Sequence, residues 1–256
     1  MTVLDLFRLD GKVALVTGAS RGLGQGMAVG LAEAGADIAG LDRTPDCNET
    51  CAQVEALGRR YFNLSIDLLN ATPEDLTRAV EQVVERLGRI DILVNNAGII
   101  RRAPALDYTV ADWDEVININ LRALFFLSQA AGRVMAAQGS GKIINVASML
   151  SFQGGILVPS YTASKSAVAG LTRALANEWA PLGVNVNAIA PGYMATDNTA
   201  PLRADPVRSE AILARIPAGD WGTPDDLKGA VVYLASDAAR YVHGAILPVD
   251  GGWLAR

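Results

Sequence analysis

Three side chains in the central part of the sequence could together handle a proton and a substrate oxygen: Ser148, Tyr161 and Lys165. Tyr161 and Lys165 are four residues apart, so on a helix the ammonium would lie beside the phenol. An ordinary tyrosine, with a pKa of about 10, is a poor base at neutral pH, but a neighbouring positive charge favours the phenolate. The pair could therefore act as general acid and base, while the Ser148 hydroxyl orients the substrate oxygen. For the tyrosine and lysine alone, a chance pairing on an exposed helix is the simpler interpretation, and the serine in register argues against it.

A glycine-rich turn, residues 16–24 (VTGASRGLG), predicts a site for the phosphates of a dinucleotide. Gly18 permits a tight turn out of a strand, Gly22 lets the backbone approach a pyrophosphate, and Gly24 permits close packing of helix on strand. The free N–H groups at the start of the following helix would face the negative charge. The spacing is G-x3-G-x-G rather than G-x-G-x-x-G, and alone it could reflect only turn chemistry. Its place between the first predicted strand and the first predicted helix favours the dinucleotide.

Asp42 ends the second predicted strand, eighteen residues beyond Gly24. A carboxylate at this point accepts hydrogen bonds from the adenosine ribose and repels a 2′-phosphate, which favours NAD over NADP. Arg21 and Arg43 have the opposite effect, because guanidinium groups bind phosphate. We expect NAD as the cofactor, with NADP as a weaker alternative. The alternative interpretation of Asp42 is a solvated acid at a strand end.

These residues must be positioned by strands and helices that alternate along the chain. Short, near-continuous apolar runs, typical of strands covered on both faces, span residues 12–16, 37–41, 61–66, 90–94, 142–147, 184–189 and 245–249. Segments with helical periodicity span residues 24–34, 48–57, 73–87, 111–138, 161–180 and 224–235. The alternation predicts one domain over residues 1–256, of the α/β class: a Rossmann-type, doubly wound parallel sheet of about seven strands with helices on both faces.

Residues 192–222 interrupt this alternation, because they hold no predicted strand and contain Pro201, Pro206 and Pro217. A segment of this length inside a compact domain usually forms a lid or a binding loop. We therefore expect it to contact the substrate. A variable surface excursion is the alternative.

The motifs also occur in a specific order. Asn95-Asn96-Ala97-Gly98 follows the fourth predicted strand, and Ser148 follows the fifth. Together with the glycine turn and Tyr161-x3-Lys165, this order resembles the short-chain dehydrogenase/reductase family over the whole chain. The resemblance implies a nicotinamide cofactor and a catalytic tetrad of Asn120, Ser148, Tyr161 and Lys165. In the family, the asparagine holds a water that relays protons from the lysine, and the lysine also holds the nicotinamide ribose.

The resemblance further implies which residues hold the cofactor. In the family, the glycine turn, the acid after the second strand and the second asparagine of NNAG bind it, an Asp-Leu pair packs on the adenine, and a Pro-Gly turn meets the nicotinamide. Carried over to this sequence, the cofactor-binding residues are Gly18, Ser20, Arg21, Gly22, Leu23, Gly24, Asp42, Asp67, Leu68, Asn96, Tyr161, Lys165, Pro191, Gly192, Met194 and Thr196.

Five blocks of sequence bear on the substrate. Within the family, they resemble enzymes that oxidise a secondary alcohol of a sugar acid with NAD, and they span residues 95–102, 147–161, 191–199, 216–224 and 249–256. A sugar acid needs cationic or several polar partners. The residues expected to contact it are Ser148, Tyr161, Gln153, Arg101, Arg102 and Arg203. Solvated surface arginines are the alternative interpretation of the last three.

Other functions within and outside the family remain open at this point. A 3-oxoacyl carrier-protein reductase, or another sugar or polyol dehydrogenase, would keep the same catalytic residues. A carrier-protein reductase needs a basic docking patch and usually NADPH, against which Asp42 and the acidic balance argue. A non-catalytic dinucleotide sensor should lack part of the tetrad, whereas this sequence keeps all four residues.

Composition excludes several classes of protein. The chain has 256 residues, of which 50% are apolar and 19% charged, and its formal net charge is −5. This balance argues against a disordered chain and against a nucleic-acid-binding surface. The most apolar segment, residues 121–137, is interrupted by charged and polar side chains, so no run of about 18 apolar residues predicts a membrane span. With no recognisable leader segment, we expect a cytoplasmic protein.

The cysteines and the single histidine suggest no metal site. Cys47 and Cys51 are one helical turn apart, but no further ligand of the same kind stands nearby, so we expect unpaired cytosolic thiols. His243 precedes the last predicted strand, where a hydrogen-bonded structural role is expected.

The apolar faces of two helices predict self-association. The helix at 161–180 places Ala167, Val168, Leu171, Leu175 and Trp179 on one broad face, and residues 121–137 are apolar nearly all round. Members of the family pair these helices across a two-fold axis. We therefore expect a homo-oligomer, with a homotetramer as the specific prediction.

Overall fold

The apolar runs of the sequence form the strands of a single sheet. The computed structural model describes residues 2–44 and 48–256. The strands are β1 (Val13–Thr17), β2 (Asp37–Asp42), β3 (Tyr61–Ser65), β4 (Ile92–Asn95), β5 (Gly141–Val146), β6 (Val184–Pro191) and β7 (Ile246–Val249). All neighbours pair in parallel in the order β3-β2-β1-β4-β5-β6-β7. The predicted doubly wound parallel sheet is confirmed.

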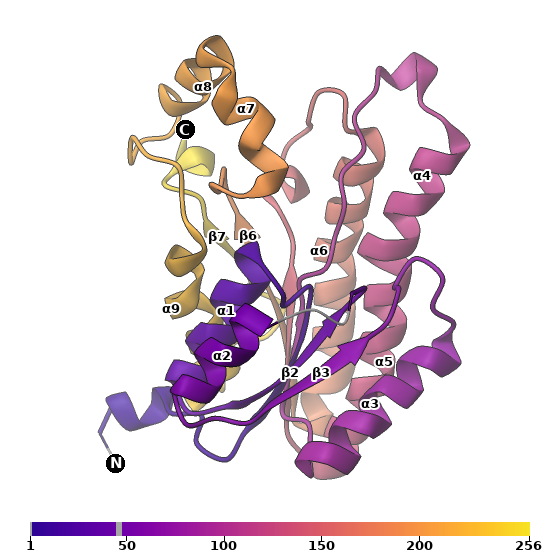
Figure 1. Ribbon diagram of the computed structural model, residues 1–256, viewed down its shortest axis with the longest axis vertical. Coiled ribbons are helices and arrows are strands. Elements are labelled where there is room, and N and C mark those ends of the chain that lie inside the picture. Colours follow the sequence, from indigo (N-terminus) through magenta and orange to yellow (C-terminus); the bar gives the residue numbers. More distant parts are fainter. Residues whose placement is uncertain (1, 45–47) are drawn as a thin grey trace.

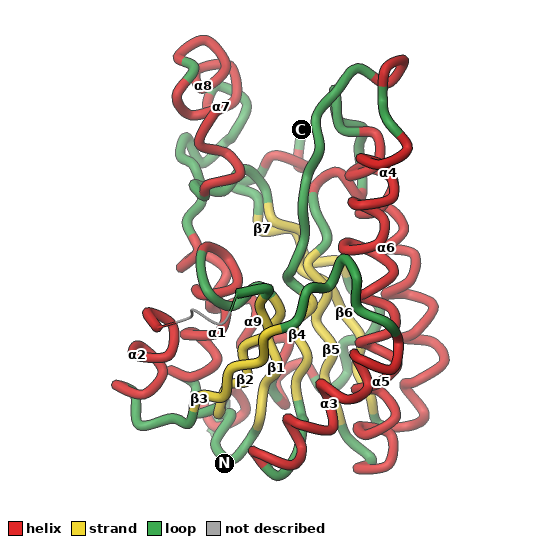
Figure 2. Tube along the Cα trace, turned by 45° about the vertical axis from the view of Figure 1, so that its right-hand side comes forward, coloured by secondary structure: helices red, strands yellow, loops and turns green. Residues whose placement is uncertain are grey.

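Helices cover both faces of this sheet (Figures 1 and 2). They are α1 (Gly22–Glu33), α2 (Asn48–Ala56), α3 (Pro73–Leu87), α4 (Val110–Ile117), α5 (Leu124–Gln138), α6 (Pro159–Trp179), α7 (Ala200–Ala204), α8 (Pro206–Leu213) and α9 (Lys228–Ala235). Helices α1, α2 and α9 share one apolar core with one face of the sheet. Helices α3, α5 and α6 share a second core with the other face.

The strands in the middle of the sheet are buried along their whole length, whereas the two edge strands are not. Every residue of β1, β4 and β6 is buried. In β3 only Leu64 is buried, and in β7 no residue is. Both edge strands still contact apolar clusters on the two faces of the sheet, β3 through Tyr61 and Leu64 and β7 through Ile246 and Leu247. Their burial is less complete than in the middle strands because each has a neighbouring strand on one side only.

The predicted helix over residues 111–138 is broken in the structure. It consists of α4, a π-helical segment (Asn118–Ala123) and α5. The wider turn of a π-helix rotates the side chains that follow it relative to an uninterrupted α-helix. Asn120 lies within this segment and is buried, with 1% of its surface exposed. The first turn of the predicted helix over residues 224–235 is likewise a 3-10 turn (Pro224–Leu227) that precedes α9.

The segment after β6 folds into a helical excursion at the carboxyl ends of the strands. It contains α7 and α8, which lie at the top of Figure 1, and we call residues 192–222 the lid. A single parallel bridge between Met194 and Gly222 joins its two ends. Within residues 2–44 and 48–256, no helix combines the length and apolar character needed to cross a membrane.

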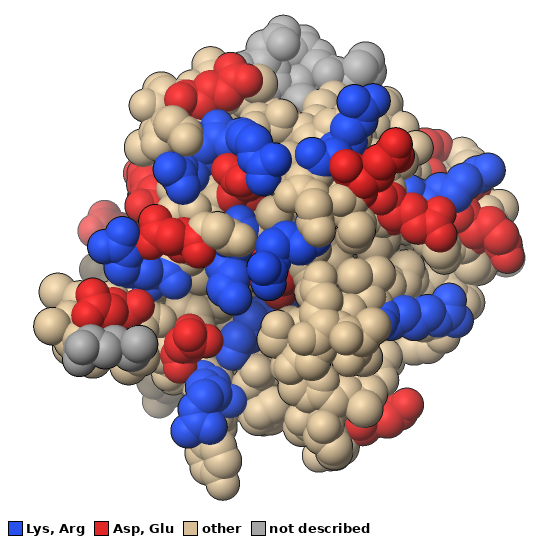
Figure 3. All heavy atoms as spheres, turned by 90° about the horizontal axis from the view of Figure 1, so that it is seen from below, with Lys and Arg blue, Asp and Glu red and all other residues tan. Residues whose placement is uncertain are grey.

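The opposite face, seen from below, carries charges of both signs (Figure 3). At the amino ends of the strands, Arg60 pairs with Asp37 at 2.7 Å and Arg89 pairs with Asp91 at 2.6 Å. The charges on this face are thus partly neutralised by their neighbours. The absence of nucleic acid among the partners stays a prediction.

Candidate active site

The predicted site residues lie on loops at the carboxyl edge of the sheet. The strand order reverses between β1 and β4, and in such sheets ligands bind in the crevice outside the strand ends at this point. The turns after these two strands carry Gly18 and Asn96. The Asn96 Nδ2 donates to the carbonyls of Thr17 and Gly18, at 2.9 and 3.2 Å, and so ties the two turns together.

The glycine turn has the geometry that a bound phosphate requires. Gly18 and Gly22 have φ of +66° and +57°, in the left-handed region that favours glycine. A Cβ on Gly24 would lie 1.9 Å from the Gly18 carbonyl oxygen, so only glycine fits there. Helix α1 begins at Gly22, and no side chain in the described part of the chain caps its N-terminus. Its first N–H groups are therefore available to an anion.

The far side of this turn faces the beginning of the lid. A Cβ on Gly22 would meet only the methyl group of Thr196, at 3.9 Å, so the glycine leaves open space between the two. This opening adjoins the uncapped N-terminus of α1. The residues present thus fit the pyrophosphate of a dinucleotide.

The carboxylate of Asp42 lies against the glycine turn and accepts a hydrogen bond from the Ser20 N–H at 2.7 Å. Arg21 points elsewhere, since its Nη1 pairs with Asp197 of the lid at 3.1 Å. The Asp42 carboxylate, which favours NAD, is therefore fixed at the glycine turn. The Arg21 guanidinium, which would favour NADP, is paired with the lid instead. Arg43 is exposed.

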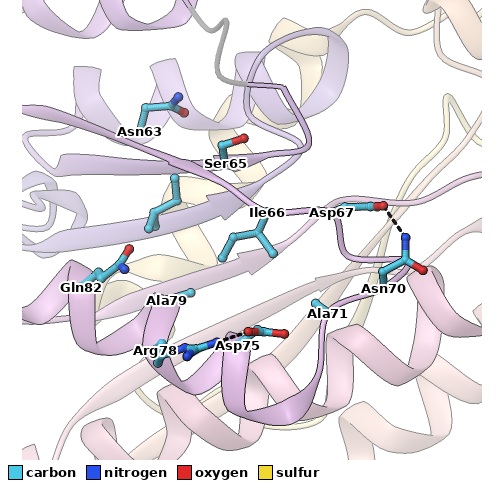
Figure 4. Close-up of a pocket in the computed structure, with 11 residues that line it drawn as sticks. Asn63, Ser65, Ile66, Asp67, Asn70, Ala71, Asp75, Arg78, Ala79 and Gln82 are labelled. Atoms are coloured by element: carbon cyan, nitrogen blue, oxygen red, sulfur yellow. Dashed lines mark hydrogen bonds and ion pairs between the residues drawn. The ribbon is translucent and has the colours of Figure 1, made fainter.

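Asp67 lies at one end of a polar groove of about 650 Å³ between β3 and α3 (Figure 4). Its carboxylate accepts from the Leu69 N–H at 3.1 Å and from the Asn70 Nδ2 at 2.7 Å. None of the four predicted catalytic residues lines this groove, which runs along the edge strand. The role of Asp67 and Leu68 at the adenine stays a prediction.

Lys165 and Tyr161 are neighbours on α6, as their spacing predicts. The Lys165 Nζ lies 5.6 Å from the centroid of the Tyr161 ring and donates to the Val146 carbonyl at 2.6 Å. Lys165 is only 3% exposed, and this burial lowers its pKa to about 8. The Ser148 hydroxyl accepts from the Leu150 N–H at 3.1 Å, which fixes the serine at the start of the loop after β5.

Burial and two neighbouring side chains set the pKa of the Tyr161 phenol. Burial raises the pKa of Tyr161, and a hydrogen bond from Ser148 and the charge of Arg102 act in the opposite direction. The charge of Arg102 thus lowers this pKa. The expected effect of Lys165 on the phenol, with its Nζ 5.6 Å from the ring centroid, stays a prediction.

Asn120 is held by both of its polar atoms. Its Oδ1 accepts from the Ile99 N–H at 2.9 Å, and its Nδ2 donates to the Ile99 carbonyl at 3.0 Å and to the Ser164 hydroxyl at 3.2 Å. A Cβ on Gly98 would lie 3.2 Å from Asn120 Oδ1 and 3.7 Å from Lys165 Nζ. Asn120 and Lys165 thus meet around Gly98, the last residue of NNAG. The water relay stays a prediction.

The predicted nicotinamide-side residues lie where β6 passes into the lid. The Gly192 N–H donates to Val249 of the neighbouring β7 at 3.0 Å, immediately after Pro191 ends the strand. Met194, at the start of the lid, is buried, and the Thr196 N–H donates to the Thr199 hydroxyl at 3.1 Å. These contacts fix the first lid residues close to the glycine turn.

The predicted substrate residues differ in how they are engaged. The Arg101 guanidinium pairs with Glu115 at 2.7 Å, which ties it to α4. Arg102 donates only to the Asn198 carbonyl of the lid, at 3.4 Å, and acts electrostatically on Tyr161. The Arg203 side chain donates to the Thr196 carbonyl at 3.2 Å. Arg102 is therefore the predicted arginine that the structure brings to the phenol.

Gln153 has a partner that sequence analysis missed. Its Oε1 accepts from the Arg215 Nη2 at 3.3 Å, and the guanidinium of Arg215 lies over the indole of Trp253. Arg215 stands in a predicted loop, and Trp253 lies near the C-terminus. No local pattern in the sequence connects the three residues.

The remaining polar candidates have structural surroundings. His243 Nε2 lies 3.0 Å from the Asn185 Nδ2, in agreement with the expected structural role. Cys51 lies on α2, whereas Cys47 falls outside the described residues. Over residues 2–44 and 48–256, no group of three or more His, Cys, Asp or Glu side chains could hold a metal ion.

Comparisons with known proteins match the whole chain. Residues 18–254 match a family model described as enoyl-(acyl carrier protein) reductase. The 2-dehydro-3-deoxy-D-gluconate 5-dehydrogenase of Escherichia coli (strain K12) is 60% identical over 257 residues, which cover 99% of this chain and 100% of that protein.

Two solved structures are also close. A protein of Agrobacterium tumefaciens described as a 2-deoxy-D-gluconate 3-dehydrogenase, with NADP bound, is 55% identical with a TM-score of 0.92, over 98% of this chain and 100% of that one. A gluconate 5-dehydrogenase of Burkholderia cenocepacia, in complex with NADP and tartrate, is 40% identical with a TM-score of 0.95, over 100% of both chains.

Burial of Lys165 should reduce stability at neutral pH. Because its pKa is about 8 in the folded protein against 10.5 ordinarily, the unfolded state binds more protons between these pH values, and stability rises with pH there. We expect Lys165→Met to abolish turnover and to raise the free energy of unfolding at pH 7 by about 1–3 kcal/mol, with the gain shrinking toward about pH 10. Urea unfolding at both pH values measures this.

A matched control is Lys228→Met, since the hydrogen bond to Glu33 raises the pKa of that lysine. This variant should be no more stable than the wild type at pH 7. A Lys165→Met protein that is less stable than the wild type at pH 7 would contradict the prediction.

Proposed function

Because the chain belongs to the short-chain dehydrogenase/reductase family, we propose that it is an NAD-dependent dehydrogenase of the C5 hydroxyl of 2-dehydro-3-deoxy-D-gluconate. It is an NAD(P)-dependent oxidoreductase that acts on a CH–OH group of a sugar acid. The observation that carries the specific substrate is the full-length similarity to an enzyme of that name, which includes the loops around the predicted tetrad.

Tyr161 takes the hydroxyl proton of the substrate in oxidation and returns it in reduction. Ser148 donates a hydrogen bond to the same oxygen and orients it toward the phenol. Arg102 favours the phenolate, and Lys165 would hold the nicotinamide ribose of a bound cofactor and would pass protons on toward Asn120. A bound nicotinamide supplies the acceptor for the hydride that leaves C5, so the alcohol loses one hydride and one proton and becomes a ketone.

The cofactor would be held by the glycine turn and the uncapped N-terminus of α1, from Gly18 to Gly24. Asp42 supports NAD over NADP, since its carboxylate stands beside Ser20 and would repel a 2′-phosphate. The NADP recorded in two neighbours belongs to those proteins. On the substrate side, Arg102, Gln153 and Arg203 would contact the sugar acid, with Arg101 behind them on Glu115.

A second candidate function is reduction of the 3-oxo group of an acyl thioester on a carrier protein, since the matching family model is described by a related reaction, that of an enoyl-(acyl carrier protein) reductase. A panel that contains sugar acids, polyols and an acyl thioester, with NAD(H) and NADP(H), separates the two. Activity confined to the thioester would overturn the proposed substrate and leave the proton-transfer chemistry intact.

Tyr161→Phe should lose turnover and keep the cofactor. The ring retains its packing, but no group remains to exchange the substrate proton, so kcat should fall by about 10²- to 10⁴-fold. NADH binding, followed by protein fluorescence, should be unchanged. Tyr241→Phe is the matched control, since Tyr241 is 91% exposed and should keep full activity. Turnover of Tyr161→Phe at the wild-type rate would defeat the mechanism.

Asp42→Asn should shift the cofactor preference toward NADP. The substitution keeps a hydrogen-bond acceptor for Ser20 and removes the charge that opposes a 2′-phosphate. We expect the ratio of kcat/KM for NAD over NADP to fall by about 10- to 100-fold, as for the loss of one like-charge contact. Asp10→Asn, an exposed position near the N-terminus, controls for net charge. An unaltered ratio in Asp42→Asn would refute the assigned role.

We further propose a homotetramer in the cytoplasm. Part of the predicted interface is used within the chain: Val168 and Leu175 are buried, and a Cβ on Gly132 would lie 2.9 Å from the Trp179 ring. That face of α6 therefore packs on α5. The support that remains is the set of apolar side chains that stand only partly buried on the two helices: Phe125 and Phe126 on α5, and Leu171 and Trp179 on α6. Light scattering at micromolar concentration should give four chains, and a monomer would rule the assembly out.

A further inference from the structure

Six arginines lie on the lid or on the loops beneath it, namely Arg21, Arg101, Arg102, Arg203, Arg208 and Arg215, and two of them pair with carboxylates. Arg21 pairs with Asp197 at 3.1 Å, and Arg101 pairs with Glu115 at 2.7 Å. The other four have no carboxylate at ion-pair distance in the described part of the chain. Of these, Arg102, Arg203 and Arg215 donate to neutral oxygens of the lid or of the loop that carries Gln153.

Arg215 differs from all the others in its surroundings. Its Cζ lies 4.0 Å from the centroid of the Trp253 ring, and its Nη2 donates to the neutral amide oxygen of Gln153 at 3.3 Å. Within the part of the chain that the structure describes, it has no carboxylate at ion-pair distance. A guanidinium that stacks by its face keeps the donors at its edge free for a bidentate contact with a carboxylate.

The Trp253 ring on which this guanidinium stacks is held in a fixed position. Trp253 is 5% exposed and packs on Tyr193, with ring centroids 4.8 Å apart. The backbone beneath Arg215 is held as well, because the side chain of Arg256 donates to the carbonyls of Ala214 at 2.7 Å and Arg215 at 3.2 Å. Little side-chain freedom remains to be lost when a ligand binds.

An independent observation also points to a missing acceptor at this place. The indole Nε1 of Trp253 is buried and has no hydrogen-bond partner among the described residues. Such buried donors without an acceptor are rare in folded proteins. Trp253 belongs to the same apolar cluster as Met149, the residue next to Ser148, so the ring beneath Arg215 packs beside the loop that carries Ser148.

We infer that Arg215, stacked on Trp253 and hydrogen-bonded to Gln153, binds the carboxylate of the substrate and thereby selects sugar acids over neutral sugars. The inference rests on the proposed function, in which the substrate is a sugar acid. On binding, the edge of the guanidinium exchanges the Gln153 amide oxygen for the carboxylate, and the Gln153 side chain becomes available to a hydroxyl group.

Arg102 is less suited to bind the substrate carboxylate. A carboxylate bound there would cancel the positive charge that favours the Tyr161 phenolate, whereas a carboxylate on Arg215 leaves that charge in place. Arg203 lies on the short helix α7 and is exposed, and its guanidinium has no aromatic platform.

The experiment compares an acid with its neutral counterpart in three variants. Wild type, Arg215→Gln, Arg102→Gln and the control Arg208→Gln are assayed with 2-dehydro-3-deoxy-D-gluconate and with its methyl ester. Arg208 is an exposed arginine on α8, the helix that ends two residues before Arg215. For Arg215→Gln, we expect kcat/KM for the acid to fall by about 10- to 100-fold through KM, as for the loss of a charged hydrogen bond. Its kcat/KM for the ester and its affinity for NADH should stay at the wild-type values, which also shows that the variant folds.

The Arg102→Gln variant should behave differently from Arg215→Gln. Arg102→Gln should move the acidic limb of the pH profile of oxidation to higher pH, because the phenol loses its cation, and should keep the wild-type ratio of acid to ester. If Arg102→Gln loses the preference for the acid and Arg215→Gln keeps it, the inference is wrong and the proposed function stands. If the wild type turns over neither the acid nor the ester, the proposed function itself fails.

Discussion

The fold around the active site is organised by one buried charge, the ammonium of Lys165. It sits 3% exposed beneath the loop after β5 and donates to the carbonyl of Val146, with no carboxylate at ion-pair distance in the described structure. A buried ammonium without a counter-ion opposes folding, which is why the pKa of this lysine drops to about 8. Such a group persists only where the surrounding structure over-determines its position.

Hydrogen bonds between segments far apart in the chain fix the position of α6 and therefore of Lys165. The Ser151 hydroxyl donates to the Lys165 carbonyl at 2.6 Å, which joins the loop that carries Ser148 to α6. Asn120 joins the NNAG turn to the same helix through Ile99 and Ser164. Because each contact links a different strand end to α6, the phenol and the ammonium are held by the whole carboxyl edge of the sheet. Local changes in any of these loops should therefore act on the same pair.

The parts of this arrangement that depend on local chemistry could be predicted from the sequence. The strands follow from short apolar runs, and α3 begins where expected because Thr72 caps it and Asp75 completes the capping box. The glycine turn likewise follows from backbone conformations that only glycine adopts easily, as at Gly18 and Gly22. For the same reason, the order of the motifs was sufficient to recognise the family.

The parts that depend on tertiary contacts could not be predicted. The π-helical segment that buries Asn120 leaves no mark on the apolar periodicity of residues 111–138, since neither glycine nor proline interrupts that stretch before Gly132. The sequence could not show how much of the apolar face of α6 is used within the chain, because the contact of Trp179 with Gly132 is decided by the path of α5. The pairing of each arginine is equally non-local.

The arginines also explain why an acidic chain suits an acidic substrate. The net charge of −5 repels an anion at long range. An anionic substrate must therefore be attracted at short range, where nearby arginines contribute more to the electrostatic potential than the net charge of the whole chain. Arg21 and Arg102 each connect a loop at the strand ends to residues 197–198 of the lid. Arg215 makes a third connection, from the far end of the lid to Gln153. The lid is thus held over the site by the same type of side chain that the substrate needs, and a sugar acid that enters would compete for these contacts. In the binding mode inferred above, a substrate carboxylate on Arg215 would replace a weaker contact to the neutral amide oxygen of Gln153, and substrate binding would thereby act on one of the three connections that hold the lid.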